Sequence, residues 1–392
     1  MSHLMNTYAR QPVAFTHGKG SHLWDSKGKE YLDAISGIAV NTLGHAHPRF
    51  TSALSAQIGK LMHVSNVYQI SEQEKLADKL CELSKMDEVF FCNSGCEANE
   101  AAIKLARLYG HKQGIESPSI IVMEKAFHGR TLATLSATGN RKVQAGFEPL
   151  VKGFVRVPYD DLAAIEQVAA HTPNIVAVLI EPIQGEGGIR IADIEYMQGL
   201  RKICDQNNWL LMLDEVQCGI GRTGTWFAFQ HANITPDVMT LAKGLGSGMP
   251  IGACLAAGKA TGTFQPGNHG STFGGNPLAC TAASTTLSII EDDKLMANAQ
   301  TIGDFIKQEL NTRLAHLTGV VEIRGQGLML GIVLAQPCGA LVGLAIEQGL
   351  LINVTADNVV RLLPSLIFSK ADAEQLLDKL CPLITDFVSQ GA

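Results

Sequence analysis

Short apolar runs alternate with longer amphipathic segments between about residues 75 and 260. The runs are apolar at nearly every position, which is typical of strands buried on both faces of a parallel sheet. We expect strands in EVFFCNS, SIIVMEK, NIVAVLIEP, WLLMLDE, DVMTLAK and IGACLAAG. Most are separated by stretches of helical length such as EANEAAIKLARLYG. This alternation predicts an α/β fold with a doubly wound, mostly parallel sheet.

The two ends of the chain show other patterns. GSHLWDSKGKEYLDAIS has two half-buried runs around the turn-forming Ser26-Lys27-Gly28, which predicts a hairpin. The C-terminal region has a long helical pattern, LMANAQTIGDFIKQELNTRLAHL, then the strands VVEIRGQGLMLGIVLA and VVRLLPS, then a closing helix. We expect these terminal pieces to pack together as a smaller α+β domain. The predicted division is an N-terminal segment of the small domain (1–49), a large cofactor-binding domain (50–285) and a C-terminal small domain (286–392).

Composition narrows the possible partners. The 392 residues are 46% hydrophobic, enough for a large core and two domains. The formal charge of -6 provides no basic stripe for nucleic acid or for anionic lipid. The start, MSHLMNTYARQPVAF, lacks the pattern of an export signal, and no apolar run reaches the roughly eighteen residues of a membrane span. Nine cysteines without a CxxC pair fit a reducing cytoplasm, so we expect a soluble cytoplasmic protein.

Charged residues follow two neighbouring predicted strands. In NWLLMLDEVQCGIGRTG the apolar run ends in Asp214 and Glu215, and the next strand, DVMTLAK, ends in Lys243. Ligands bind outside the carboxyl ends of such strands, so we expect Asp214 and Lys243 to lie over the same edge of the sheet. Taken alone, Lys243 is better explained as a lysine at a strand end whose amine reaches solvent. For Glu215 and Gln217, a solvated or structural polar role explains the sequence as well as a functional one.

A third feature is the strand-to-helix passage FFCNSGCEANEAAIKLARLYG. Free N–H groups at a helix start that is approached through glycine bind phosphate well, and Ser94, Gly95 and Cys96 occupy that start. Taken alone, ordinary capping by Asn93 or Ser94 is the better explanation of the pattern, since such caps are common. A lysine, a carboxylate and a phosphate cup are together what pyridoxal 5'-phosphate requires. We expect Lys243 to bond its aldehyde, Asp214 its ring nitrogen, Gln217 its hydroxyl, and Val216 to pack on the ring.

Seven motifs in order carry a family resemblance. They are LWDSKGKEYLDAISGIAVNTLGHAHP, FFCNSGCEANEAAIKLAR, FHGRTLATLSATG, EPIQGEGGI, LLMLDEVQCGIGRTG, LAKGLGSGMPIGA and GSTFGGNPLA. The chain resembles the class III (ω-amino) aminotransferases of the type I pyridoxal phosphate-dependent transferase fold over nearly its whole length. The resemblance implies transfer of an ω-amino group to 2-oxoglutarate by a homodimer with shared active sites.

The resemblance also implies residue roles. Gly95 and Cys96 would bind phosphate through backbone N–H groups, with Cys96 where alanine is more usual. Phe127 would stack on the cofactor ring, and Arg130 would grip the substrate α-carboxylate, for which a guanidinium fork is suited. Thr272 would reach the phosphate of the neighbouring subunit. Without the family, a surface ion pair would explain Arg130, and a turn or cap would explain Thr272.

Two further residues would let one pocket accept two substrates. In the family, a glutamate at the position of Glu186 pairs with an arginine at that of Arg361 and hides it from the amine donor. Release of that arginine frees it for the α-carboxylate of 2-oxoglutarate. A static salt bridge is the simpler alternative.

The resemblance favours N2-acetylornithine as donor, which would give N-acetylglutamate 5-semialdehyde and glutamate, a reaction that arginine biosynthesis runs in reverse. N-succinylornithine, N-succinyl-diaminopimelate and free ornithine stay open as donors, as do other pyridoxal phosphate reactions.

Other functions fit the sequence less well. Residues 219–224 satisfy the G-x-G-x-x-G fingerprint of nicotinamide enzymes, but DEVQC intervenes after the strand and TWFAFQH follows. We interpret these glycines as a loop shaped around the cofactor pocket. Retention of Lys243 and Asp214 argues against a non-catalytic binding protein. His45 and His47 form no complete metal site, and we expect His128 to hold the loop beside Phe127.

Overall fold

A seven-stranded sheet forms the centre of the computed structural model, which describes residues 3–390. The strand order is β4-β12-β11-β10-β7-β5-β6. The strands are β4 (Glu88–Cys92), β5 (Ser119–Met123), β6 (Phe154–Val157), β7 (Ile175–Ile180), β10 (Leu210–Asp214), β11 (Val238–Leu241) and β12 (Gly252–Ala256). All six strands expected in this region are confirmed. The sequence pattern missed β6, an edge strand on which Arg156 is exposed, so its run is not uniformly apolar.

The sheet is mostly parallel, as predicted. Strand β10 runs parallel to β11 and β7, and β5 runs parallel to β7 and β6. Only β12 is antiparallel to its neighbours, β11 and β4. The carboxyl ends of β4, β7, β10 and β11 therefore meet at one edge of the sheet.

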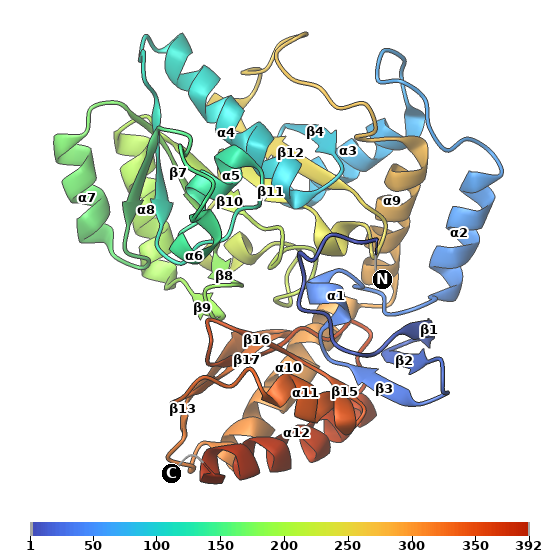
Figure 1. Cartoon of the computed structure of the whole chain (residues 1–392). Helices are drawn as coiled ribbons and strands as arrows, with labels where there is room; N and C mark the ends of the chain where they lie inside the picture. Colours follow the sequence, from blue (N-terminus) through green and yellow to red (C-terminus); the bar gives the residue numbers. More distant parts are fainter. Residues whose placement is uncertain (1–2, 391–392) are drawn as a thin grey trace.

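Helices cover both faces of this sheet (Figure 1). The uniform burial of β10 reflects this, because its side chains alternate between two cores. Leu210 and Met212 pack in one cluster with the small residues of α4 (Gly95–Lys112), while Leu211 and Leu213 pack in the other with residues of α8 (Ile194–Gln206). The helices and short elements of this part are α2 (Pro48–Ile58), α3 (Ser71–Ser84), α4 (Gly95–Lys112), α5 (Leu132–Ala137), α6 (Arg141–Gln144), α7 (Leu162–His171), β8 (Ile183–Gln184), β9 (Arg190–Ile191), α8 (Ile194–Gln206), η1 (Ala228–Ala232), η2 (Lys243–Leu245), η3 (Gly258–Ala260) and α9 (Pro277–Asp292).

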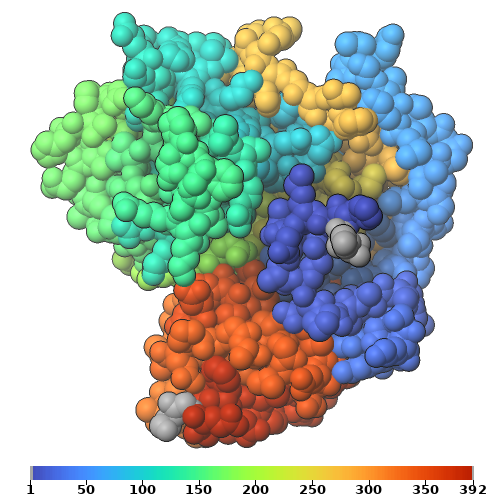
Figure 2. Space-filling view, viewed as in Figure 1, coloured from blue at the N-terminus to red at the C-terminus, as the bar shows by residue number. Residues whose placement is uncertain are grey.

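The two ends of the chain pack together. Strands β1 (Phe15–Lys19), β2 (His22–Asp25) and β3 (Glu30–Asp33) form the predicted hairpin with one added strand, and β3 pairs in parallel with β15 (Leu350–Leu351). Figure 2 shows the N-terminal segment, in blue, against the orange and red C-terminal part. The remaining elements are α1 (Ser36–Ala39), α10 (Leu295–Leu314), β13 (Val320–Gln326), β14 (Met329–Leu334), α11 (Leu341–Glu347), β16 (Asn353–Thr355), β17 (Val359–Leu362) and α12 (Lys370–Gln390).

The C-terminal part contains a second, antiparallel sheet, in the order β13-β14-β17-β16. Helices α10 and α12 accompany it (Figure 1), and the predicted strands and closing helix are confirmed. The domain limits at residues 49 and 285 stay predictions. No helix among residues 3–390 combines the length and apolar character needed to span a bilayer.

Candidate active site

Asp214 and Lys243 lie at the same edge of the central sheet. Asp214 is the last residue of β10, in register with Thr240 of β11, and Lys243 follows β11 at the start of η2. Both side chains line a cavity of about 390 Å³, a size typical of small-molecule sites. The prediction that the two charges share a pocket is confirmed.

Lys243 is held in a demanding environment. Its φ of 36° is uncommon for a residue other than glycine, and such strain clusters at functional sites. Burial lowers the pKa of its amine, and Arg361 lowers it further, against the opposing effects of Glu186, Asp214 and Glu181. A lowered pKa leaves more of the amine neutral, which is the form that attacks a carbonyl.

Asp214 is buried and heavily hydrogen-bonded. Its Oδ2 accepts a hydrogen bond from Asn99 Nδ2 at 2.7 Å and lies 2.8 Å from His128 Nδ1, while its Oδ1 accepts the Val216 N–H at 3.1 Å. A carboxylate offers about four acceptor sites, so one remains for a ligand. Asn99 Nδ2 also donates to the His128 carbonyl at 2.8 Å. His128 thus connects its loop to Asp214, in keeping with the expectation that it holds that loop.

The start of α4 forms one wall of the cavity. Ser94, Gly95 and Cys96 line it, and Ser94 caps the helix by accepting the Glu97 N–H at 3.2 Å. Ser94 therefore caps the helix, but the N–H groups of the first turn still lack acceptors within the helix. A Cβ at Gly95 would lie 2.6 Å from Val216 Cγ1, so only glycine allows this close approach. Val216 and Gln217 line the same cavity.

Cys96 contacts the loop that carries Phe127 and Arg130. Its sulfur accepts hydrogen bonds from the N–H groups of Arg130 and Thr131, both at 3.3 Å. The sulfur also lies 3.2 Å from Thr134 Oγ1. The unusual cysteine therefore fits without crowding the helix start.

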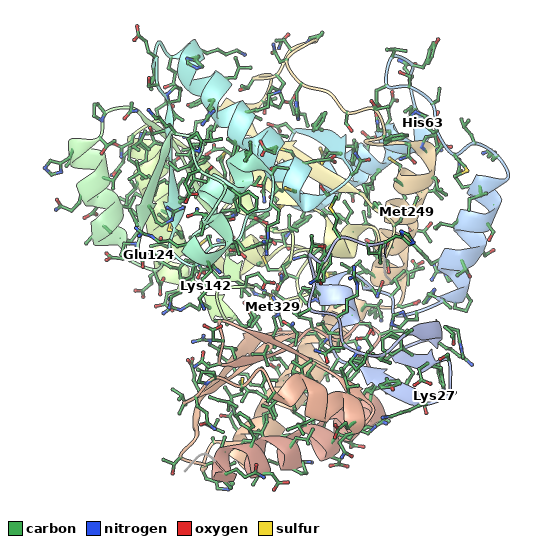
Figure 3. All side chains as sticks on the ribbon, viewed as in Figure 1. Lys27, His63, Glu124, Lys142, Met249 and Met329 are labelled. Carbon is green, nitrogen blue, oxygen red and sulfur yellow. The ribbon has the colours of Figure 1, made fainter. Side chains whose placement is uncertain are left out.

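Phe127 and Arg130 stand between two adjoining cavities. Both residues line the first cavity and a second one of about 960 Å³. The Arg130 guanidinium lies 5.6 Å from the centre of the Phe127 ring and has no ion-pair partner within residues 3–390, so the expected alternative of a surface ion pair is not observed. Lys142, which also lines the second cavity, lies where the part that carries the central sheet meets the C-terminal part (Figure 3).

The predicted pair of Glu186 and Arg361 is present. Arg361 Nη1 lies 2.6 Å from Glu186 Oε1, and the arginine is 1% exposed. Asn353 Oδ1 accepts from Nε and Nη2 of Arg361, and Gln217 Oε1 accepts from Nη1 at 3.3 Å. Burial alone would raise the pKa of Glu186, but the charge of Arg361 lowers it, so the glutamate is ionised. Whether this pair opens for a second substrate stays a prediction.

Comparison with known proteins agrees with this geometry. Residues 4–384 match the family described as aminotransferase class III. The chain belongs to the class III aminotransferases. It is 63% identical to an acetylornithine aminotransferase of Nitrosomonas europaea over 99% of both chains, and 48% identical to one of Aquifex aeolicus over 97% of this chain and 99% of the other.

Solved structures of aminotransferases share the fold. Ornithine aminotransferase of Toxoplasma gondii has a TM-score of 0.95 at 32% identity, covering 99% of this chain and 94% of that one. N-acetylornithine aminotransferase of Stenotrophomonas maltophilia has a TM-score of 0.85 at 36% identity, covering 98% of each. The type I pyridoxal phosphate-dependent fold predicted from the motifs is confirmed.

Class III aminotransferases depend on pyridoxal phosphate, and the cavity fits it. The Lys243 amine suits its aldehyde, the open acceptor site of Asp214 suits a protonated ring nitrogen, and the helix start at Gly95 suits its phosphate. Thr272 does not line this cavity. It is exposed and lines a separate cavity of about 350 Å³ with Glu97 and His269. Its role across a subunit boundary stays a prediction.

One interpretation of a motif was wrong. The glycines of residues 219–224 do not line the first cavity, and two of them, Gly221 and Gly224, pack against the C-terminal part. A Cβ at Gly221 would lie 2.9 Å from Leu366, and one at Gly224 would lie 2.7 Å from Gln300. Between these glycines, buried Arg222 donates to the carbonyls of Leu328 and Pro364. The loop therefore joins the two parts of the chain.

Three polar residues of the site were missed from sequence. Glu181 and Asn99 line the first cavity, and Asn353 lines the second. Glu181 could have been found, because it follows the buried strand β7 just as Asp214 closes β10. Among the described residues no cluster of three His, Cys, Asp or Glu could hold a metal, and His45 Nε2 lies 2.8 Å from Asp33.

Glu215, which follows Asp214, is a structural acid. Its oxygens accept the N–H groups of Ala228 and Phe229, both at 2.7 Å, and burial raises its pKa to about 7. A carboxyl whose pKa is raised in the folded state contributes its full stability below the pKa of the unfolded state. That contribution is lost as the pH rises through the pKa of the folded state.

Between about pH 5 and about pH 8, ionisation of Glu215 should lower the unfolding free energy of the unmodified protein by about 3 kcal/mol. We expect Glu215→Gln to abolish this decrease. The glutamine cannot ionise, so its unfolding free energy lacks this titration. Urea unfolding at several pH values measures this slope, and an unchanged slope would contradict the assignment.

Proposed function

We propose that this aminotransferase transfers the ω-amino group of N2-acetylornithine to 2-oxoglutarate, forming N-acetylglutamate 5-semialdehyde and glutamate, with pyridoxal 5'-phosphate as cofactor. The observation that carries the proposal is the arrangement of two arginines, one unpaired and one paired with a glutamate, around adjoining cavities. The identity to relatives named acetylornithine aminotransferase supports this donor.

The cofactor, when bound, supplies an aldehyde for amines and a ring that accepts electrons. Lys243 would hold the aldehyde in the resting enzyme, and once free its amine would serve as the base for the proton on the carbon that bears the substrate nitrogen. Asp214 would keep a proton on the ring nitrogen. The N–H groups of Gly95 and Cys96 would bind the phosphate, Phe127 and Val216 would pack on the ring, and Gln217 would bond its hydroxyl.

The two arginines account for two unlike substrates. Acetylornithine presents one α-carboxylate, which Arg130 binds, and an uncharged acylated nitrogen. During that half-reaction Glu186 neutralises Arg361, so no unpaired cation faces the uncharged part of the donor. 2-Oxoglutarate carries two carboxylates, and its α-carboxylate would draw Arg361 away from Glu186.

We also propose that two chains share their sites. Thr272 lies beside Phe273, which is 62% exposed, and Asn66 ties this loop to the segment with Val67 and Tyr68, 80% and 67% exposed. Exposed apolar groups on two tied segments suit a homodimer interface that brings Thr272 to the partner's phosphate. Sedimentation of the purified protein as a monomer would contradict this proposal.

The donor can be tested in half-reactions. Purified protein with pyridoxal phosphate is mixed with each candidate amine in the absence of keto acid, and the visible absorbance of the bound cofactor is followed. Fast conversion by N2-acetylornithine, reversed by 2-oxoglutarate, would support the proposal. Faster conversion by N-succinylornithine, N-succinyl-diaminopimelate or ornithine would replace the donor, and failure to bind pyridoxal phosphate would reject the cofactor.

Replacement of Arg361 by alanine should affect the two substrates unequally. We expect KM for 2-oxoglutarate to rise about 100-fold, since a buried charge contact of about 3 kcal/mol is lost, while KM for acetylornithine rises less than about fivefold. Steady-state kinetics with each substrate varied measures both constants. Arg201→Ala serves as control, because Arg201 is a largely buried arginine paired with Asp237 outside both cavities. Equal increases for both substrates would contradict the switch.

A further inference from the structure

Glu181 is a buried acid at the edge of the first cavity. It follows directly after β7, is 5% exposed and lines the cavity with Lys243 and Asp214. Its Oε1 accepts the Phe127 N–H at 2.8 Å, and its Oε2 accepts the Gly185 N–H at 3.1 Å. One carboxylate therefore connects two separate loops of the site.

Each connected loop carries a residue with a proposed role. The first contains Phe127 itself, and the second contains Glu186, one residue after Gly185. Gly185 also packs closely on Gln217, since a Cβ there would clash with Gln217 Oε1. Gln217 in turn accepts from Arg361 Nη1 at 3.3 Å. The position of Gly185 therefore affects two partners of Arg361, Glu186 and Gln217.

Only a carboxylate meets both demands of this position. The two N–H groups reach different oxygens of Glu181, and each oxygen must accept. A glutamine has one acceptor oxygen, and its NH2 group would face the other N–H without a bond. A buried N–H without an acceptor is costly, so one of the two loops would move.

We propose that Glu181 is a positioning residue that holds the Phe127 loop and the Gly185–Glu186 turn at a constant separation while Arg361 changes partners. The inference rests on the proposed roles of Phe127 and Glu186. Glu181 makes no covalent bond and transfers no proton in this role. Its effect on catalysis is transmitted through the two backbone N–H groups.

Glu215 provides a matched control within the same chain. Like Glu181 it is buried and accepts two backbone N–H groups, and burial raises the pKa of both carboxyls. Those groups belong to Ala228 and Phe229, which do not line the first cavity. Glu215→Gln therefore reproduces the cost of losing a buried acceptor without releasing either loop of the site.

Hydrogen exchange tests the connection directly. We expect Glu181→Gln to accelerate amide exchange about tenfold in peptides that contain Phe127 and Gly185, in the full chain with and without pyridoxal phosphate. Glu215→Gln should accelerate exchange at residues 228–229 and leave those two peptides unchanged. Unchanged exchange at both Phe127 and Gly185 in Glu181→Gln would overturn the proposal.

Kinetics separate positioning from a purely structural role. We expect Glu181→Gln to raise KM for the amine donor about tenfold and to change kcat less than about threefold, because a displaced Glu186 no longer neutralises Arg361 while the donor binds. Accelerated exchange with unaltered KM would leave Glu181 structural and overturn the proposal. If no donor reacts with the unmodified protein, the proposed function fails while the exchange result still stands.

A second variant covers the case in which Glu181→Gln does not fold. Glu181→Asp keeps two acceptor oxygens but is one methylene shorter, so it can reach one loop only. We expect faster exchange in one of the two peptides and not in both. Exchange at the rate of the unmodified protein in both would overturn the proposal.

Discussion

Replacement of Lys243 by alanine is expected to slow the half-reaction with the amine donor by about ten-thousandfold, the upper range for a positioned base. The variant lacks the amine that we propose bonds the aldehyde and moves the substrate proton. Stopped-flow absorbance with N2-acetylornithine measures this rate. A loss below about tenfold would show that another group removes the proton.

Lys259 supplies the control for this experiment. It also lies just beyond a strand of the central sheet and forms ion pairs with Asp205 and Asp237, but it lines neither cavity. Lys259→Ala should therefore keep the half-reaction rate within about twofold. Borohydride treatment provides a direct readout, because it should attach the cofactor to Lys243 in the unmodified protein. Labelling of another lysine would contradict the assignment.

The second large effect is expected for Asp214→Ala, which should lower kcat about 1000-fold and change KM for the donor less than about fivefold. In the proposed mechanism the negative charge of Asp214 would keep the ring nitrogen protonated, and this would matter most once the substrate carbon has lost its proton. Steady-state kinetics and cofactor titration separate turnover from binding. Equal losses in kcat and in cofactor affinity would indicate a binding role alone.

Asp237→Asn is the matched control for Asp214→Ala. Asp237 is a buried acid beside the same sheet, where it accepts the Leu211 N–H at 2.8 Å and pairs with Arg201. It lies outside the cavity, so its replacement should lower stability and leave kcat within about threefold. A comparable loss of turnover in both variants would mean that Asp214 acts through the fold.

Much of the fold follows from local patterns in the sequence. The uniformly apolar runs identify six strands of the central sheet, because such runs can be satisfied only by burial on both faces. The pattern did not predict strand β6, because this strand lies at the edge of the sheet, where polar and apolar side chains mix. The interpretation of the glycines of residues 219–224 was wrong for a related reason. The close contacts of Gly221 and Gly224 are with Leu366 and Gln300, residues distant in sequence.

The site divides in the same way. Asp214 and Lys243 were predictable because acid and base each follow a buried strand, and neighbouring parallel strands end at one edge. Glu181 also directly follows a buried strand, β7, but the motif that contains it predicted a role only for Glu186. Asn99 carries no local signal, since an asparagine within a helix is usually solvated. Only its bond to Asp214 shows that it belongs to the site.

The sequence by itself determined the class of fold, the family, and the lysine, acid and helix start that suit the cofactor, because each depends on side-chain type and position along one strand or helix. The tertiary structure decided how those groups are held. The bonds of Asp214 to Asn99 and His128, of Arg361 to Glu186 and Asn353, and of Glu181 to two loops join residues from separate elements. Such contacts depend on how the elements pack, and no local pattern records them.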